Sequence, residues 1–249
     1  MDRLHTQHHR LYLPPGAPDD ATRLLGDDGR VRALVLALGG PADWAALVPL
    51  WRGVQAELKW PEPAIVVNGR GAFELWFSLA EPLPQGEAAR LLAQLQHRYL
   101  GGVRADRVHA WPGADAAAEL PACPPFAAGP ERWAAFVTPD LPAVFGDDPA
   151  LDFEPGADAQ AELLARLRPV SGAELRSALA ALGDVGQAAL APTAGGASPV
   201  PQPVTPPGAT GMGPSDDPRA FLTAVMNDAT VSLALRIEAA KGLLQAPGR

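Results

Sequence analysis

Side chains that could hold single-stranded nucleic acid follow one glycine-rich turn of the sequence. The turn is Asn68-Gly69-Arg70-Gly71, and aromatic and basic residues occupy the segments that come after it. Single-stranded bases stack on aromatic rings, and arginines bind the phosphate backbone. This chemistry predicts a small binding surface made of Arg70, Phe73, Trp76, Arg104, Arg107 and His109. The competing interpretation places the aromatic rings in the protein core and the arginines in solvent.

Carboxylates for metal-dependent nucleotidyl transfer are sparse. That reaction needs several oxygen ligands around hard divalent cations. The available set is Glu74 and Asp106, with one carboxylate from the 140–152 segment: Asp147, Asp148 or Asp152. We therefore predict no catalytic residues and no cofactor.

The histidines and the cysteine of the sequence form no recognisable metal-binding or catalytic motif. His5, His8 and His9 could bind a metal, but no carboxylate accompanies them, which favours a polar terminus without a metal. Cys123 is the one cysteine of the chain and has no histidine near it in the sequence. It therefore lacks a base that could activate it as a nucleophile.

Charge and composition limit the kinds of partner. The 249 residues carry a formal net charge of −8, and all of it lies in residues 111–249, since residues 1–110 hold 12 basic and 12 acidic side chains. Such a chain repels polyanions at long range, so any nucleic-acid contact must be local. The polar start of the sequence and the lack of a long apolar run predict a cytoplasmic protein without a membrane partner.

Hydrophobic periodicity predicts the elements that must position these side chains. Apolar runs predict four strands, and spacings of three and four residues predict two helices. Their order is strand 31–38, helix 44–58, strand 64–67, strand 72–79, helix 86–100 and strand 107–111. This order is the split βαβ, ferredoxin-like pattern of an α+β fold, with a four-stranded antiparallel sheet and helices on one face.

The remaining segments complete the expected organisation. Residues 1–30 are predicted to form an N-terminal extension, and 31–182 one domain, in which 114–130 is irregular and 131–137 can pack back on the sheet. Ser171 and Glu174 fit a capping box at the start of a helix. Residues 183–215 are rich in Pro, Gly and Ala and predict a disordered linker, and 216–249 predict a helical module.

The segment around the turn resembles the archaeo-eukaryotic primase superfamily. The residues that carry the resemblance are 63–71, with Asn68-Gly69-Arg70-Gly71 in place of the family's Ser-Gly-x-Gly turn, and Leu75 to Pro82 after it. The likeness extends over roughly residues 31–113, under half of the chain. It implies a primase-polymerase scaffold of the kind found in plasmid and phage replication proteins.

This sequence departs from that family at the metal ligands. The family's Asp-x-Asp pair would fall within residues 36–40, which are Leu-Ala-Leu-Gly-Gly. Its histidine falls at Phe73 or Glu74, and its later aspartate could only be Asp106. The resemblance therefore implies a degenerate domain that has lost nucleotidyl transfer.

A second, shorter resemblance lies near the C-terminus. Residues 217–228 and 236–241 resemble a helical motif of phage small terminase subunits, which bind DNA and assemble into rings. The match has few basic residues, so an amphipathic helix pair that docks on a protein partner is the competing interpretation.

Three functional hypotheses follow from these patterns. The first is a non-catalytic binding protein of phage or mobile-element origin, whose ligand is single-stranded nucleic acid or a nucleotide. The second is an adaptor that recruits a protein partner through residues 216–249. The third is a divergent metal-dependent nucleotidyl transferase.

Overall fold

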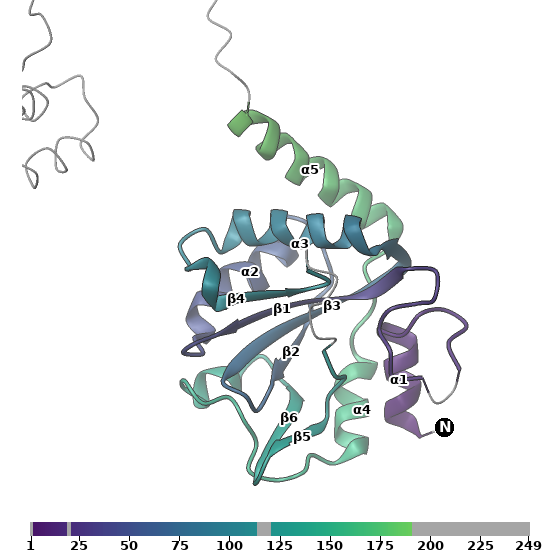
Figure 1. The fold of residues 1–249 in the computed structure, drawn as a ribbon, viewed down its shortest axis with the longest axis vertical. Coiled ribbons are helices and arrows are strands. Elements are labelled where there is room, and N and C mark those ends of the chain that lie inside the picture. Colours follow the sequence, from purple (N-terminus) through teal and green to yellow (C-terminus); the bar gives the residue numbers. More distant parts are fainter. Residues whose placement is uncertain (1, 19–20, 114–120, 191–249) are drawn as a thin grey trace, which may run out of the picture. The chain divides into compact units, whose positions relative to one another are not determined.

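A six-stranded antiparallel sheet with helices on both faces forms the described part of the chain in the computed structural model (Figure 1). The structure describes residues 2–18, 21–113 and 121–190. In chain order the elements are α1 (Arg3–Leu11), β1 (Arg30–Gly39), α2 (Trp44–Ala56), β2 (Ala64–Val67), β3 (Ala72–Pro84), α3 (Gln85–Tyr99), η1 (Ala105–Arg107), β4 (Val108–Trp111), β5 (Phe126–Gly129), β6 (Arg132–Val137), η2 (Pro142–Val144), α4 (Ala157–Ala165) and α5 (Gly172–Leu190).

The sheet is larger than the sequence pattern predicts. Its strand order is β4-β1-β3-β2-β6-β5, and every paired neighbour runs antiparallel. The expectation of four strands is wrong, because β6 pairs along β2 and β5 pairs along β6. The expectation that 114–130 is irregular is also wrong at residues 126–129, which form β5.

One face of the sheet packs against α2 and α3. Alternate residues of a strand point to opposite faces, so Phe73, Leu75 and Phe77 share this face. The ring of Phe73 lies 5.9 Å from that of Trp44, and the ring of Phe77 lies 5.8 Å from that of Trp60. All three of these β3 residues are at most 2% exposed.

The opposite face is covered in part by α1 and α4 (Figure 1). The ring of Tyr12, directly after α1, lies 5.2 Å from that of Trp76 and 6.1 Å from that of Phe136. The expected placement of helices on one face is therefore wrong, and residues 1–30, predicted as an N-terminal extension, include a helix that packs on the sheet. Local sequence patterns do not reveal this packing, because it depends on contacts between distant residues. The Arg32 guanidinium donates hydrogen bonds to the backbone carbonyls of Arg10 (2.9 Å) and Leu13 (3.3 Å).

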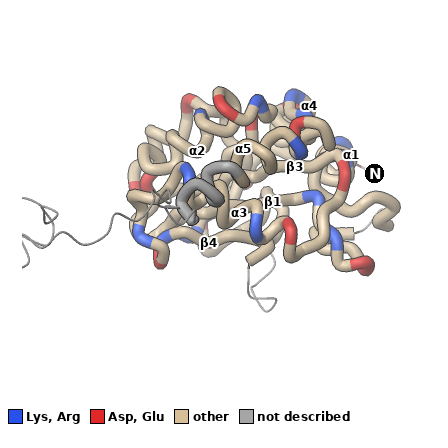
Figure 2. Tube along the Cα trace, turned by 90° about the horizontal axis from the view of Figure 1, so that it is seen from above, with Lys and Arg blue, Asp and Glu red and all other residues tan. Residues whose placement is uncertain are grey.

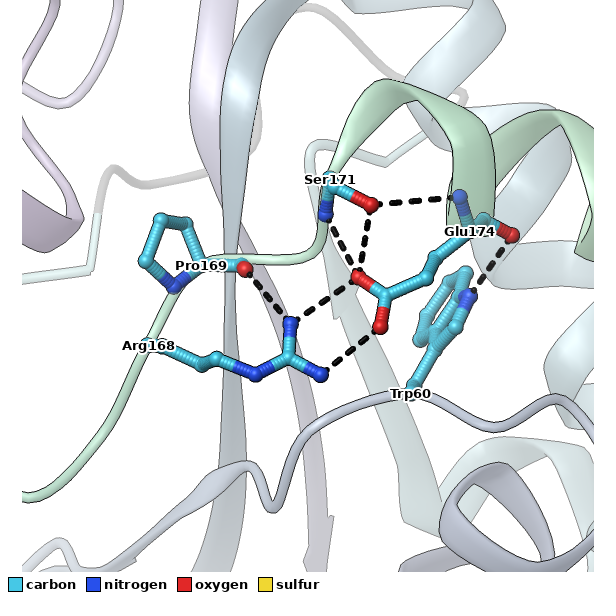
Figure 3. A network of polar contacts seen from close by, with 5 residues as sticks. All are labelled: Trp60, Arg168, Pro169, Ser171 and Glu174. Atoms are coloured by element: carbon cyan, nitrogen blue, oxygen red, sulfur yellow. Dashed lines mark hydrogen bonds and ion pairs between the residues drawn. The ribbon is translucent and has the colours of Figure 1, made fainter.

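A capping box begins α5, as the sequence predicts (Figure 3). The Glu174 carboxylate accepts a hydrogen bond from the Ser171 backbone N–H at 2.8 Å, and the Glu174 N–H donates to Ser171 Oγ at 3.3 Å. Arg168 forms an ion pair with the same carboxylate at 2.7 Å, and Trp60 Nε1 donates to the Glu174 carbonyl at 3.3 Å. The contact with Trp60 ties α5 to the segment after α2.

The boundary of the expected linker is shifted. Residues 183–190 continue α5, so the prediction of a linker that starts at 183 is wrong over that stretch. The rest of the linker, the helical module at 216–249 and the terminase-like motif lie outside the described residues.

Basic and acidic residues are mixed along the described part of the chain. Figure 2 shows Lys and Arg interspersed with Asp and Glu along the described trace. Within the described ranges, none of the helices combines the length and hydropathy that spanning a bilayer requires.

Candidate functional site

A hollow of about 720 Å³ lies on the sheet face that α1 and α4 leave partly open. It is lined by residues of β1, β3 and β4, by the turn between β2 and β3, and by residues from the 121–126 segment. Its volume falls within the range of small-molecule sites, about 300–1,000 Å³. The glycine-rich turn singled out in the sequence is thus part of the wall of a cavity.

The turn at residues 68–71 is held rigidly. Asn68 Oδ1 accepts hydrogen bonds from the backbone N–H groups of Arg70 (2.8 Å) and Ala72 (3.0 Å). Gly69 donates its N–H to the Pro149 carbonyl (3.0 Å), and its own carbonyl accepts from Arg132 Nε (2.9 Å). Because Oδ1 of Asn68 faces these backbone donors, its amide nitrogen faces Glu74.

Glu74 places a carboxylate in the middle of the sheet. It pairs with Ala37 of β1 and Val66 of β2, and its side chain lines the hollow. Asn68 Nδ2 donates to Oε1 at 3.1 Å, and Trp76 Nε1 donates to Oε2 at 2.7 Å. Burial raises the pKa of Glu74 above its usual value, and the hydrogen bonds from Trp76 and Asn68 and the nearby charge of Arg70 oppose that rise.

Two of the six side chains predicted to bind nucleic acid line the hollow. Arg70 and His109 are both exposed there. The Arg70 guanidinium carbon lies 5.4 Å from the centroid of the Phe126 ring, within the range of a cation–π contact. These residues give the rim of the hollow its positive and aromatic character.

Phe73 and Trp76 belong to the core, as the competing interpretation predicts, so their rings are not free to stack on bases. Phe73 is 0% exposed under α2, and Trp76 is 1% exposed between Tyr12 and Phe136. Tyr12, which packs against Trp76, belongs to residues 1–30, and these were expected to form an extension outside the domain. Trp76 acts on the hollow indirectly, since its indole N–H holds the Glu74 carboxylate.

Arg104 and Arg107 are engaged elsewhere, and neither lines the hollow. Arg104 forms an exposed ion pair with Asp106. Arg107 donates to the carbonyls of Gly39 (3.1 Å) and Pro41 (2.6 Å), and so fixes the end of β1 next to the hollow. Its role is to position the backbone.

Besides Glu74, three polar or aromatic side chains that line the hollow were not among the six residues predicted to bind nucleic acid. They are Asn68, Trp111 and Phe126. Trp111 ends the strand that also carries His109, so strand alternation (residues two apart share a face) could have found it. The sequence did not indicate that Phe126 lies on a strand of the sheet, because β5 is only four residues long and is recognised only by its pairing with β6.

The carboxylates considered for metal binding do not gather at the hollow. Of that set, Glu74 is the one that lines it, while Asp106 pairs with Arg104 and Asp148 with Arg132. Among the residues that the structure describes, no group of three or more His, Cys, Asp and Glu side chains is placed to hold a metal ion.

The N-terminal histidines lie on α1. His5 and His9 are joined by a contact between their Nε2 atoms at 3.1 Å. Burial lowers the pKa of His8 to about 4, so this imidazole is neutral at physiological pH. They pack beside the core and are separate from the hollow.

Comparison with known proteins adds no relative. No protein-family model matches the chain, and no curated protein matches it significantly. The primase-like and terminase-like resemblances therefore rest on the residues quoted from the sequence alone.

Proposed function

We propose that this chain is a non-catalytic binding protein that holds a single-stranded nucleic-acid end or a nucleotide in the hollow beside the 68–71 turn. The observation that carries the proposal is the combination of an exposed cation, Arg70, with aromatic walls and a recessed carboxylate in one cavity of about 720 Å³. A phosphate suits the cation at the rim, and a base suits the aromatic and polar interior.

The wall chemistry supports a planar ligand. The half-buried Phe126 and the exposed His109 come from two different strands and line the same cavity, and Trp111, 6% exposed, lies behind them. Base–aromatic stacking contributes about 1–3 kcal/mol per base. With a net charge of −8 on the whole chain, stacking and one local cation must supply the affinity that long-range attraction does not.

The donor set argues against phosphoryl transfer. Divalent cations in such reactions are held by several oxygen ligands. In the hollow the Glu74 carboxylate already accepts hydrogen bonds from Asn68 and Trp76, and no second acidic side chain of the described residues lines the cavity. Binding without transfer is the activity that these residues support.

The scaffold is proposed to be a degenerate primase-like domain of the split βαβ type. The order β4-β1-β3-β2, with α2 and α3 packed on one face, supports this proposal. On this view β5, β6, α1 and α4 are additions that widen the sheet and close part of its second face.

Fluorescence anisotropy with labelled single-stranded oligonucleotides, at low and moderate salt, tests the proposal. We expect binding that weakens with salt and falls about tenfold in Arg70→Ala. Arg104→Ala is the matched control, because Arg104 is exposed and paired with Asp106 away from the hollow. Undetectable binding at low salt, or equal losses in the two variants, would overturn the proposal.

A further inference from the structure

We infer that the hollow selects guanine, through the two acceptor positions of the Glu74 carboxylate that no donor of the described residues occupies; the inference rests on the proposed function. The ligand class is thus a guanine base, either within a single strand or in a free nucleotide.

The hydrogen bonds around Glu74 fix which groups it can still accept. Asn68 Nδ2 occupies one position on Oε1, and Trp76 Nε1 occupies one position on Oε2. A carboxylate oxygen has two lone pairs, so each oxygen retains one acceptor position. Asn68 cannot turn its amide, because its Oδ1 already accepts two backbone N–H groups. The carboxylate is therefore held in one orientation, and each of its oxygens accepts from one donor of the described residues.

Guanine is the base that matches this pair of acceptors. Its Watson–Crick edge presents the N1–H and one N2–H next to each other, both as donors. Adenine and cytosine each present an amino group beside a ring acceptor, and thymine presents one N–H between two carbonyls. A ring or carbonyl acceptor placed against a carboxylate is repelled, so these bases lose an interaction and gain a repulsion.

The charges around the cavity disfavour the other ligand with paired N–H donors, a guanidinium group. Arg70 is exposed on the rim of the same hollow, and its positive charge repels a second cation. The same charge attracts the phosphate of a nucleotide. Phe126, which is half-buried in the wall, provides flat apolar surface for a purine ring, whereas Trp111 is only 6% exposed and backs the cavity.

The test uses the full chain and a labelled oligothymidylate that carries one central guanine, adenine, cytosine or hypoxanthine. Hypoxanthine keeps N1–H and lacks the 2-amino group, so it removes one donor without any change to the protein. We expect the guanine probe to bind about tenfold more tightly than the adenine probe, with hypoxanthine in between. Competition by GMP, IMP and AMP distinguishes a free nucleotide from a base within a strand.

Two variants locate the selectivity. Glu74→Gln replaces one acceptor with an amide donor, and we expect the guanine preference to fall to about twofold or less while some binding to all probes remains. Asp106→Asn is the control, because that carboxylate is exposed and lies off the hollow. Its preference should equal that of the original chain.

The outcomes separate the two proposals. If no oligonucleotide or nucleotide binds, the proposed function fails and the inference fails with it. If oligonucleotides bind equally well whatever their central base, if hypoxanthine equals guanine, or if another base binds best, the selectivity is wrong and the binding function stands. A preference that survives in Glu74→Gln also overturns the assignment to Glu74.

Discussion

Replacing Gly69 with alanine should destabilise the protein far more than the same change two residues later. Gly69 has φ +68°, and a Cβ atom there would lie 2.5 Å from the Cβ of Ala128, 3.3 Å from the carbonyl carbon of Trp133 and 3.4 Å from the nitrogen of Ala134. Gly71 has φ +84° and no heavy atom within 4 Å of such a Cβ. The two positions therefore share the backbone penalty and differ in steric contact.

The expected magnitudes follow from this difference. A non-glycine residue in the left-handed region costs about 1–2 kcal/mol, which applies to both variants. Forcing an extra methyl group against packed strands costs a further 1–3 kcal/mol or so, which applies to Gly69→Ala alone. We expect Gly71→Ala to lose roughly 1–2 kcal/mol of unfolding free energy and Gly69→Ala roughly 2–5 kcal/mol.

Urea unfolding followed by circular dichroism gives both free energies by linear extrapolation. The same two variants should be carried into the oligonucleotide assay, because the turn forms one wall of the hollow. If Gly69→Ala is no less stable than Gly71→Ala, the close approach of the turn to β5 and β6 is wrong, and so is the wall that it builds.

Three further predictions concern side chains. Glu174→Ala should lower the free energy of unfolding by about 1–2 kcal/mol at pH 7, because it removes the capping box of α5. The hydrogen bond from Arg168 lowers the pKa of Glu174 from 4.5 to about 2, so the stabilisation by this carboxylate is complete above about pH 4.5 and is lost as the pH falls through 2. Urea titrations at several pH values measure this dependence. Guanine preference should weaken as the pH is lowered from 7, because burial raises the pKa of Glu74 above its usual value and protonation removes an acceptor; a preference that does not change as the pH is lowered would contradict the assignment. Arg32→Met should cost about 2–4 kcal/mol and expose the first 13 residues to limited proteolysis, since it leaves the carbonyls of Arg10 and Leu13 without their donor.

The sequence predicted the elements whose signals are local. The runs at 31–38, 64–67 and 72–79 are apolar over consecutive residues, and each corresponds to a strand. The capping box was found because both of its partners, Ser171 and Glu174, lie within one helical turn. In each of these cases the stabilising contact lies within a few residues, so the pattern in the chain and the contact in space coincide.

The second face of the sheet could not be predicted in the same way. It depends on α1, which is short and carries more polar than apolar residues, and which is held by hydrogen bonds to Arg32 some 20 residues away. If α1 is not placed on the sheet, the Trp76 ring is expected to be exposed to solvent. With α1 in place, Trp76 is buried in the core, and its indole N–H donates a hydrogen bond to the Glu74 carboxylate. The wrong expectation for Trp76 thus came from the unforeseen packing of α1, and not from a wrong assignment of strand β3.

The geometry of β3 also bears on the proposed primase-like origin. The resemblance leaves the family's histidine at either Phe73 or Glu74, one residue apart. Alternation along the strand directs Phe73 toward Trp44 and Glu74 into the hollow, so only position 74 can present a side chain to a ligand there.

Small residues at the end of β1 bear on the same proposed origin. Ala37, Gly39 and Gly40, which fall in the stretch where that family carries its paired aspartates, line the same hollow. On the proposed origin, small residues stand where acidic side chains would project, and the space they leave forms part of the cavity. A site that once held cations among several carboxylates would then hold a neutral base against Glu74, the one carboxylate among the described residues that line the hollow.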